Sequence, residues 1–301
     1  MIDPSIGAML RSRYTIHRFF ALYGVILAVI LLLLWVLTTN LEAGSAARDA
    51  STNFLGNFAA TVAIFLVTYG FYVFVTPPGL RNAEVLPLRS AEIADEIVDV
   101  SKAASDYWFW GRSGSYFRAV VLPRLAELAR RDRQHVTVRI VLPDPDGPGN
   151  DLRYAAIKHG LGETADQNTL AANVVATVVA AAAASAQNPY LHVHIGLCAT
   201  VPALRYDLAT SGGLITRDAR SLPAILVNAG NPYFEMFRDA VENELAQSRK
   251  VTWDDNATVL HESGEVSVAD ALTVVSGLTV KDSAIITAAS SLLASKTHRY
   301  A

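Results

Sequence analysis

Residues 19–37 read FFALYGVILAVILLLLWVL, and residues 54–75 read FLGNFAATVAIFLVTYGFYVFV. Neither stretch contains a charged residue. At about 1.5 Å of rise per residue, each forms a helix of roughly 30 Å, which is the hydrocarbon thickness of a bilayer. A helix also satisfies all of its own backbone groups in lipid. The two stretches therefore predict a transmembrane helical hairpin over residues 19–76, and this hairpin decides the plan of the molecule.

The first apolar stretch has a competing interpretation as a cleaved signal peptide. Its apolar core is long for a signal peptide, and the residues that follow it, TTNLE, make a poor small-residue cleavage site. A second apolar stretch also follows almost at once. These observations favour a retained hairpin.

Basic residues are distributed unequally around the hairpin. The short connection between the stretches contains a single basic residue, Arg48, which is next to Asp49. The arginines near the outer ends are Arg11, Arg13, Arg18, Arg81 and Arg89. The positive-inside rule then predicts an inner-membrane protein with both termini in the cytoplasm, including residues 1–18. The single cysteine, Cys198, agrees with a reducing compartment for the soluble part.

The second apolar stretch is richer in small residues than the first. Gly56 and Ala60 form one small-xxx-small pair, Ala59 and Ala63 form another, and Asn57 adds a polar group. Small residues let helix backbones approach closely, and an amide bonds across a helix interface. These five residues predict a transmembrane interface. They line either a homo-oligomeric bundle, with a possible pore, or the contact with the first helix, and the sequence leaves both open.

The rest of the chain predicts a cytosolic α/β domain between two smaller segments. A Thr-Pro-Pro-Gly breaker at residues 76–79 precedes an amphipathic neck helix in residues 77–104. Strands and helices alternate over residues 105–250, which predicts a mixed sheet with helices on both faces. The predicted strands cover residues 107–110, 135–142, 190–199, 203–208, 214–217 and 224–228, and the predicted helices cover residues 115–133, 152–159, 164–187 and 231–249.

The last segment, residues 251–301, differs in composition from the α/β domain. A capping box at Ser267 and a possible cap at Asp282 predict two short helices, the first ending at Gly277. These helices form either a C-terminal helical module or a cap on the core of the α/β domain.

A candidate ligand site lies in the sequence Gly111-Arg112-Ser113-Gly114-Ser115, between a predicted strand and a predicted helix. Glycines free the backbone to approach a ligand, and a helix start offers unpaired N–H groups at the positive end of the dipole. Serine hydroxyls and an arginine add hydrogen bonds and charge. The pattern predicts an anion or phosphate cradle, although it matches neither the P-loop nor the dinucleotide fingerprint.

Three further arginines are candidate counter-charges for that ligand. Arg118 lies in the helix that follows the loop, and Arg205 and Arg217 lie on later strands. If these strand ends converge, the site lies at the carboxyl edge of the sheet, where ligands of open α/β sheets bind. Asp207 and Asp218 offer the competing possibility of surface ion pairs.

The histidines predict no metal or cofactor site. His192 and His194 share one face of a strand, but no Cys, Asp or Glu nearby in the sequence completes a ligand set. A structural role is therefore the expectation for both.

Residues 90–250 resemble the phospholipase D-like fold. The resemblance rests on the aromatic strand followed by Gly-Arg-Ser-Gly, on VRIVLPDP at residues 138–145, on RYDL at residues 205–208 and on NPYFE at residues 231–235. The active family uses His-x-Lys, whereas His192 is followed two positions later by His194, and His194 by Gly196. The resemblance thus implies a domain that binds a ligand without hydrolysing it, and hence a protein that is not an enzyme.

A two-span hairpin joined to a ligand-binding domain is also similar in plan to membrane effectors of bacterial anti-phage systems of the CBASS, Panoptes and Hailong types. That similarity implies a homo-oligomeric membrane effector controlled by a nucleotide or short oligonucleotide, which a partner nucleotidyltransferase makes. The alternatives are a membrane-tethered phosphodiesterase or phospholipase with a diverged site, and a ligand-free membrane scaffold.

Overall fold

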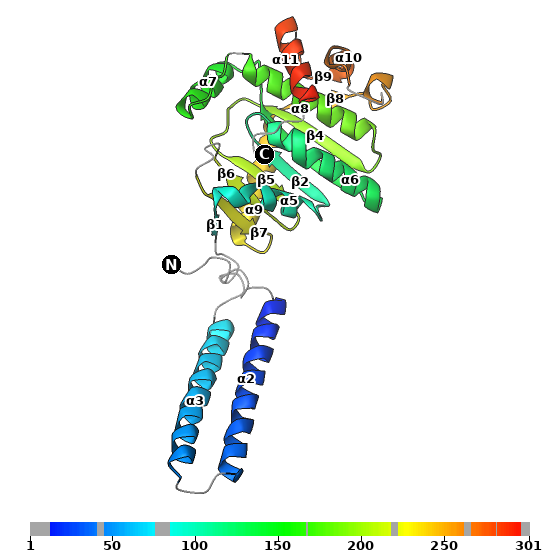
Figure 1. Cartoon of the computed structure of the whole chain (residues 1–301). Helices are drawn as coiled ribbons and strands as arrows, with labels where there is room; N and C mark the ends of the chain where they lie inside the picture. The colour runs from blue at the N-terminus through cyan, green and yellow to red at the C-terminus, as the bar shows by residue number, and fades with distance from the viewer. Residues whose placement is uncertain are drawn as a thin grey trace. The chain divides into compact units, whose positions relative to one another are not determined.

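The computed structural model of the chain describes residues 13–40, 45–75, 85–166, 168–217, 222–261, 266–280 and 282–295. The chain divides into two compact units, Met1–Glu84 and Val85–Ala301 (Figure 1).

The first unit consists of two long apolar helices, α2 (Arg13–Asn40) and α3 (Ala46–Val75), which pack side by side (Figure 1). Their most apolar windows, Phe20–Asn40 and Asp49–Phe71, are long and apolar enough to cross a membrane. The predicted pair of long apolar helices is therefore confirmed.

One stripe of α3 packs against α2. Ala59 and Val62 are buried together with Ile30 of α2, and Leu55 and Leu66 extend the same contact along the helix. These α3 positions follow the three- and four-residue spacing of one helix face. Within a single chain, this stripe holds the hairpin together.

The other members of the predicted interface are less buried than Ala59. Asn57 and Ala60 are exposed, Gly56 and Ala63 are half-buried, and a Cβ built on Gly56 would meet no atom within 4 Å. Ala59 is therefore the member of the predicted interface that serves the contact with α2. The surface containing Asn57 and Ala60 is open to another partner.

The second unit is built on a mixed sheet of nine strands among the described residues, in the order β1-β7-β6-β5-β2-β3-β4-β8-β9. The central strands β2, β3 and β4 are parallel, and their neighbours are antiparallel. The strands are β1 (Leu86–Leu88), β2 (Asp106–Trp110), β3 (Val136–Pro143), β4 (Leu191–Cys198), β5 (Arg205–Ala209), β6 (Gly212–Thr216), β7 (Ala224–Asn228), β8 (Arg249–Trp253) and β9 (Val275–Ser276).

Helices cover both faces of this sheet. Side chains alternate along β2, so Tyr107 and Phe109 enter one apolar cluster and Trp108 enters another. The first cluster lies under α5, α6 and α8, and the second lies under α9. The helices are α5 (Ile93–Ser101), α6 (Leu122–Asp132), α7 (Asn150–Gly160), α8 (Thr169–Ala186), α9 (Pro232–Gln247), α10 (Val268–Val274) and α11 (Ser283–Ala294).

The Ala- and Val-rich helix α8 is long and apolar enough to cross a membrane, yet it lies inside the second unit. Val174, Val175, Val178 and Val179 are fully buried. The helix contacts β4, α6 and α11. The predicted helix over residues 164–187 is therefore present as α8, and its apolar character serves the core.

The segment predicted as a neck differs from the prediction. In its described part, β1 pairs with β7, and α5 buries Ile93, Ile97 and Val100 in the core of the α/β unit. The predicted amphipathic helix is present as α5. Its apolar face contacts the sheet domain itself, so from Val85 onward these residues belong to the second unit.

The C-terminal segment completes the α/β unit. β8 adds to the sheet beside β4, and α11 packs on α8. The two predicted caps are present: the Ser267 side chain accepts from the Asp270 N–H, and Asp282 Oδ1 accepts from the Ala284 N–H at 2.8 Å. Of the two possibilities raised by the sequence, the structure shows helices that cap the core.

Candidate functional site

The first two residues of the loop after β2 are fixed by packing. The Gly111 N–H donates to the Val141 carbonyl at 3.2 Å, and a Cβ at Gly111 would lie 2.5 Å from the Phe109 ring. Arg112 is buried and donates from Nη2 to the Ala203 carbonyl at 3.3 Å. Gly111 and Arg112 therefore hold the loop against the sheet.

Thr177 of α8 ties the second half of the loop to the helical layer. Gly114 has φ +65°, and a Cβ there would lie 2.8 Å from both Oγ1 and Cγ2 of Thr177. Thr177 Oγ1 also lies 3.2 Å from the Ser113 carbonyl and 2.8 Å from the Asn173 carbonyl. Glycine is needed at position 114 both for its left-handed backbone and for this close approach.

Arg118 lies in a π-helical turn, Phe117–Val121, that leads into α6. Its side chain is 9% exposed, and Nη1 donates to Thr177 Oγ1 at 2.9 Å and to the Asn173 carbonyl at 3.3 Å. None of the carboxylates in the described part of the chain forms an ion pair with it. Burial lowers the pKa of Arg118 to about 10, so the guanidinium remains charged at neutral pH.

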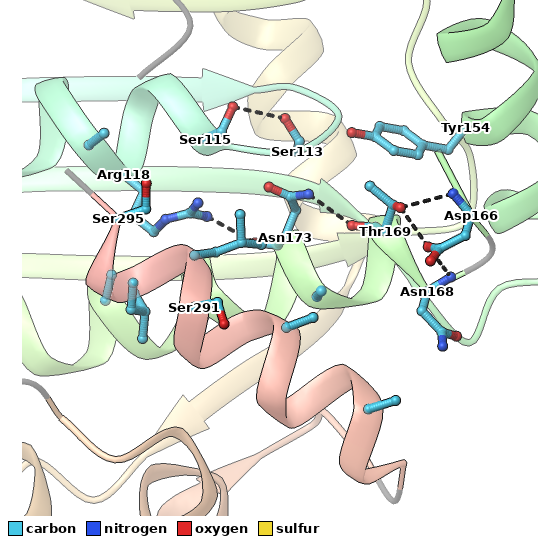
Figure 2. A pocket seen from close by; sticks show the side chains of 17 residues that line it. Ser113, Ser115, Arg118, Tyr154, Asp166, Asn168, Thr169, Asn173, Ser291 and Ser295 are labelled. Carbon is cyan, nitrogen blue, oxygen red and sulfur yellow. Dashed lines mark hydrogen bonds between the residues drawn. The ribbon is translucent and has the colours of Figure 1, made fainter. Parts of the chain in front are cut away.

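Arg118 faces a cavity of about 910 Å³ between the start of its helix and the helices α7, α8 and α11 (Figure 2). Ser113 and Ser115 lie on the same wall, so three of the residues predicted from the sequence meet there. The other polar residues of the described lining are Tyr154, Asp166, Asn168, Thr169, Asn173, Ser291 and Ser295.

An acidic group stands at the N-terminus of α8, at another end of the cavity (Figure 2). Asp166 Oδ1 accepts from the Thr169 hydroxyl at 2.6 Å and from the Asn168 N–H at 3.1 Å. The hydrogen bond from Thr169 lowers the pKa of Asp166, which is ionised at neutral pH. Its charge also complements the positive end of the α8 dipole.

The remaining predicted arginines point elsewhere. Arg205 Nε lies 2.6 Å from Oδ2 of Asp207, which is fully buried and also accepts from the Tyr107 hydroxyl at 2.9 Å. Arg217 is exposed directly after β6 and does not line the cavity. The structure therefore shows the competing ion pair for Arg205. The corresponding partner of Arg217, Asp218, lies outside the described residues.

A polar stripe on α8 is a sequence signal for part of the cavity that the loop motif does not include. Thr169, Asn173 and Thr177 recur every four residues in a helix that is otherwise nearly all Ala and Val. A period of four places them on one face of α8, the face that bonds Asp166, Arg118 and Ser113. Ser291 and Ser295 of the C-terminal segment carry the same signal, because Ser283, Thr287, Ser291 and Ser295 also recur every four residues in a largely apolar segment.

In the described part of the chain, neither the histidines nor Cys198 line this cavity. His135 Nδ1 is 2.8 Å from His192 Nε2, and burial lowers the pKa of His194. Burial raises the pKa of the Cys198 thiol to about 11, and this thiol donates to the Thr200 carbonyl at 3.0 Å. The described residues contain no group of three or more His, Cys, Asp or Glu that could hold a metal ion.

Comparisons of the chain with protein-family models, with curated proteins and with solved structures found no match. The resemblance to the phospholipase D-like fold and the similarity to anti-phage effectors therefore stay predictions.

Proposed function

We propose that this protein is a homo-oligomeric membrane effector whose soluble unit binds an anionic ligand, a nucleotide or short oligonucleotide, in the Arg118 cavity. The observation that carries the proposal is the buried guanidinium of Arg118, which faces a cavity and has no carboxylate partner among the described residues. The ligand's occupancy of the cavity controls the state of the apolar hairpin.

A buried charge is expensive unless it is paired, because it loses its hydration. The Asn173 carbonyl and the Thr177 hydroxyl accept hydrogen bonds from Nη1 and so replace part of the lost hydration of Arg118. A negatively charged ligand in the cavity would neutralise its charge. Hydroxyls from Ser113 and Ser115 border the same space and suit phosphoryl oxygens. The cavity is thus better suited to an anion than to a neutral molecule.

The described lining of the cavity contains no histidine beside Ser113 and Ser115 that could act as their general base. The binding role rests on the buried guanidinium of Arg118, which faces the cavity. To act as a switch, the ligand must bind two states of the protein with different affinities.

The membrane role rests on α2 and α3 and on the arginine distribution, which favours cytoplasmic termini. The role in anti-phage defence and the partner nucleotidyltransferase are proposed from the similarity of plan to membrane effectors of bacterial anti-phage systems. Such a partner would supply the ligand.

The proposal is tested by native mass spectrometry of the full chain, purified in detergent from its own host. We expect an added mass on the wild-type protein and its loss in Arg118→Met. Arg217→Met is the matched control, because it removes an exposed arginine outside the cavity, and it should keep the added mass. An equal loss in both variants, or no added mass together with no binding of any nucleotide or short oligonucleotide, would contradict the proposal.

The open face of α3 predicts the oligomer contact. Ala60→Leu adds bulk to the exposed surface beside Asn57, and we expect it to shift the oligomer toward smaller species in detergent. Leu32→Ala, on the exposed surface of α2, is the control and should leave the oligomer intact. The measurement is size-exclusion chromatography with light scattering. An equal effect of both substitutions would remove the argument for an α3 interface.

A further inference from the structure

The described lining of the Arg118 cavity contains one positively charged and one negatively charged side chain. Among the described residues that line it, Arg118 is the single cationic side chain and Asp166 the single acidic one. Of the neighbouring arginines, Arg112 and Arg205 do not line the cavity, and the charge of Arg205 is neutralised by its ion pair with Asp207. The electrostatics of the described lining therefore match a ligand with a single anionic group.

The two charges are separated along α8. The Asp166 carboxylate accepts a hydrogen bond from Thr169, the first residue of α8. Arg118 donates hydrogen bonds to Asn173 and Thr177, farther along the same helix. With about 1.5 Å of rise per residue, these positions lie roughly 6 to 12 Å beyond Thr169 along the helix axis. A ligand that meets both charges needs an anionic group at one end and a hydrogen-bond donor at the other.

We infer that the ligand is a mononucleotide with one phosphoryl group, either a nucleoside monophosphate or a 3′,5′-cyclic mononucleotide. Its phosphate lies at Arg118, Ser113 and Ser115, and an amino group of its base lies at the Asp166 carboxylate. This inference rests on the proposed function and narrows its ligand class. The volume of about 910 Å³ lies within the range of small-molecule sites.

The charge count argues against longer ligands. Each additional phosphate of a triphosphate or an oligonucleotide would enter the cavity without a second cation from the described lining. It would also approach Asp166, whose hydrogen bond from Thr169 keeps the carboxylate ionised. Like charges at close range disfavour binding, so the same features that accept one phosphate reject several.

The test is calorimetry on the full chain in detergent, with ligand pairs that share a base and differ in phosphate number. The pairs are AMP with ATP, GMP with GTP, CMP with CTP, and 3′,5′-cyclic AMP with cyclic di-AMP. We expect at least one single-phosphate member to bind ten-fold or more tightly than its partner. Arg118→Met should weaken the binding of that ligand by roughly ten-fold or more, which is the contribution of a charge-assisted hydrogen bond. Asp166→Asn should reduce the ratio within the pair.

The outcomes separate the two proposals. If a triphosphate or the dinucleotide binds as tightly as its partner and loses binding in Arg118→Met, the single-phosphate inference is wrong and the proposed function stands. If no ligand binds and no added mass copurifies, the proposed function fails as well. A chain that ends at Ser295 removes Lys296 and Arg299, which lie outside the described residues. It should keep the ratio, and a changed ratio would overturn the single-cation argument.

Discussion

Gly114→Ala is expected to lower the free energy of unfolding of the soluble unit by about 2–5 kcal/mol. The left-handed backbone at φ +65° contributes roughly 1–2 kcal/mol of this loss for a residue with a Cβ. The new Cβ would also lie 2.8 Å from Thr177, and overpacking of this kind costs about 1–3 kcal/mol. Urea denaturation of the full chain in detergent, followed by tryptophan fluorescence, measures the change.

Two further variants separate the backbone term from the clash at Gly114. Gly149 has φ +75° and no atom within 4 Å of a built Cβ, so Gly149→Ala should lose the backbone term alone. Thr177→Ala in the Gly114→Ala background removes the atoms in the way and should recover part of the stability, as a favourable coupling in a double-mutant cycle. Equal losses at Gly114 and Gly149 would show that contact with Thr177 is unimportant.

Arg118→Met is expected to leave the stability of the ligand-free protein unchanged or to raise it, while ligand binding is lost. Methionine fills similar space without requiring the desolvation of a charge. Thr177 Oγ1 keeps its contacts with the Asn173 and Ser113 carbonyls after the substitution. A gain in stability with a loss of function is the behaviour of a binding residue, because sites retain groups that the fold does not need. The same urea titration, performed with and without the copurified ligand, measures both effects.

The control for Arg118 is Arg205→Met. Arg205 neutralises Asp207, whose side chain is 0% exposed, so its removal leaves a buried carboxylate without its cation. Breaking a buried pair in this way costs about 3–5 kcal/mol. We therefore expect Arg205→Met to destabilise the protein strongly and Arg118→Met not to do so. A similar loss in both variants would assign Arg118 a structural role and remove the basis for the ligand site.

The candidate site was predictable from the sequence only in part. A loop and a helix start that are local in sequence predict Ser113, Ser115 and Arg118, and all three line the cavity. Charge alone predicts Arg112, Arg205 and Arg217, and none of them lines it. The sequence states that an arginine is charged, whereas its partner depends on which backbone carbonyl or carboxylate the fold brings within reach.

The sequence by itself determined the features that depend on short-range periodicity and composition. The apolar helices α2 and α3, the strand–loop–helix order around Gly111–Ser115, and the caps at Ser267 and Asp282 all follow from residues within a few positions of one another. Local hydrophobic periodicity and capping chemistry act over one or two helical turns, so they are legible without any tertiary contact.

Tertiary structure alone decided the placement of α5, the addition of β8 to the sheet, and the contribution of α11 to the cavity. An amphipathic pattern shows that a helix has an apolar face, but not which surface covers it. The same limit applies to Arg118 and Arg205. Both are arginines, but Arg205 pairs with a carboxylate and Arg118 bonds to neutral acceptors. Arg118 bonds to Asn173 and Thr177, which are more than fifty residues away in the sequence. Arg205 pairs with Asp207, which also accepts a hydrogen bond from the distant Tyr107. Burial and ion pairing are set by distances in space, and only the folded chain defines these distances.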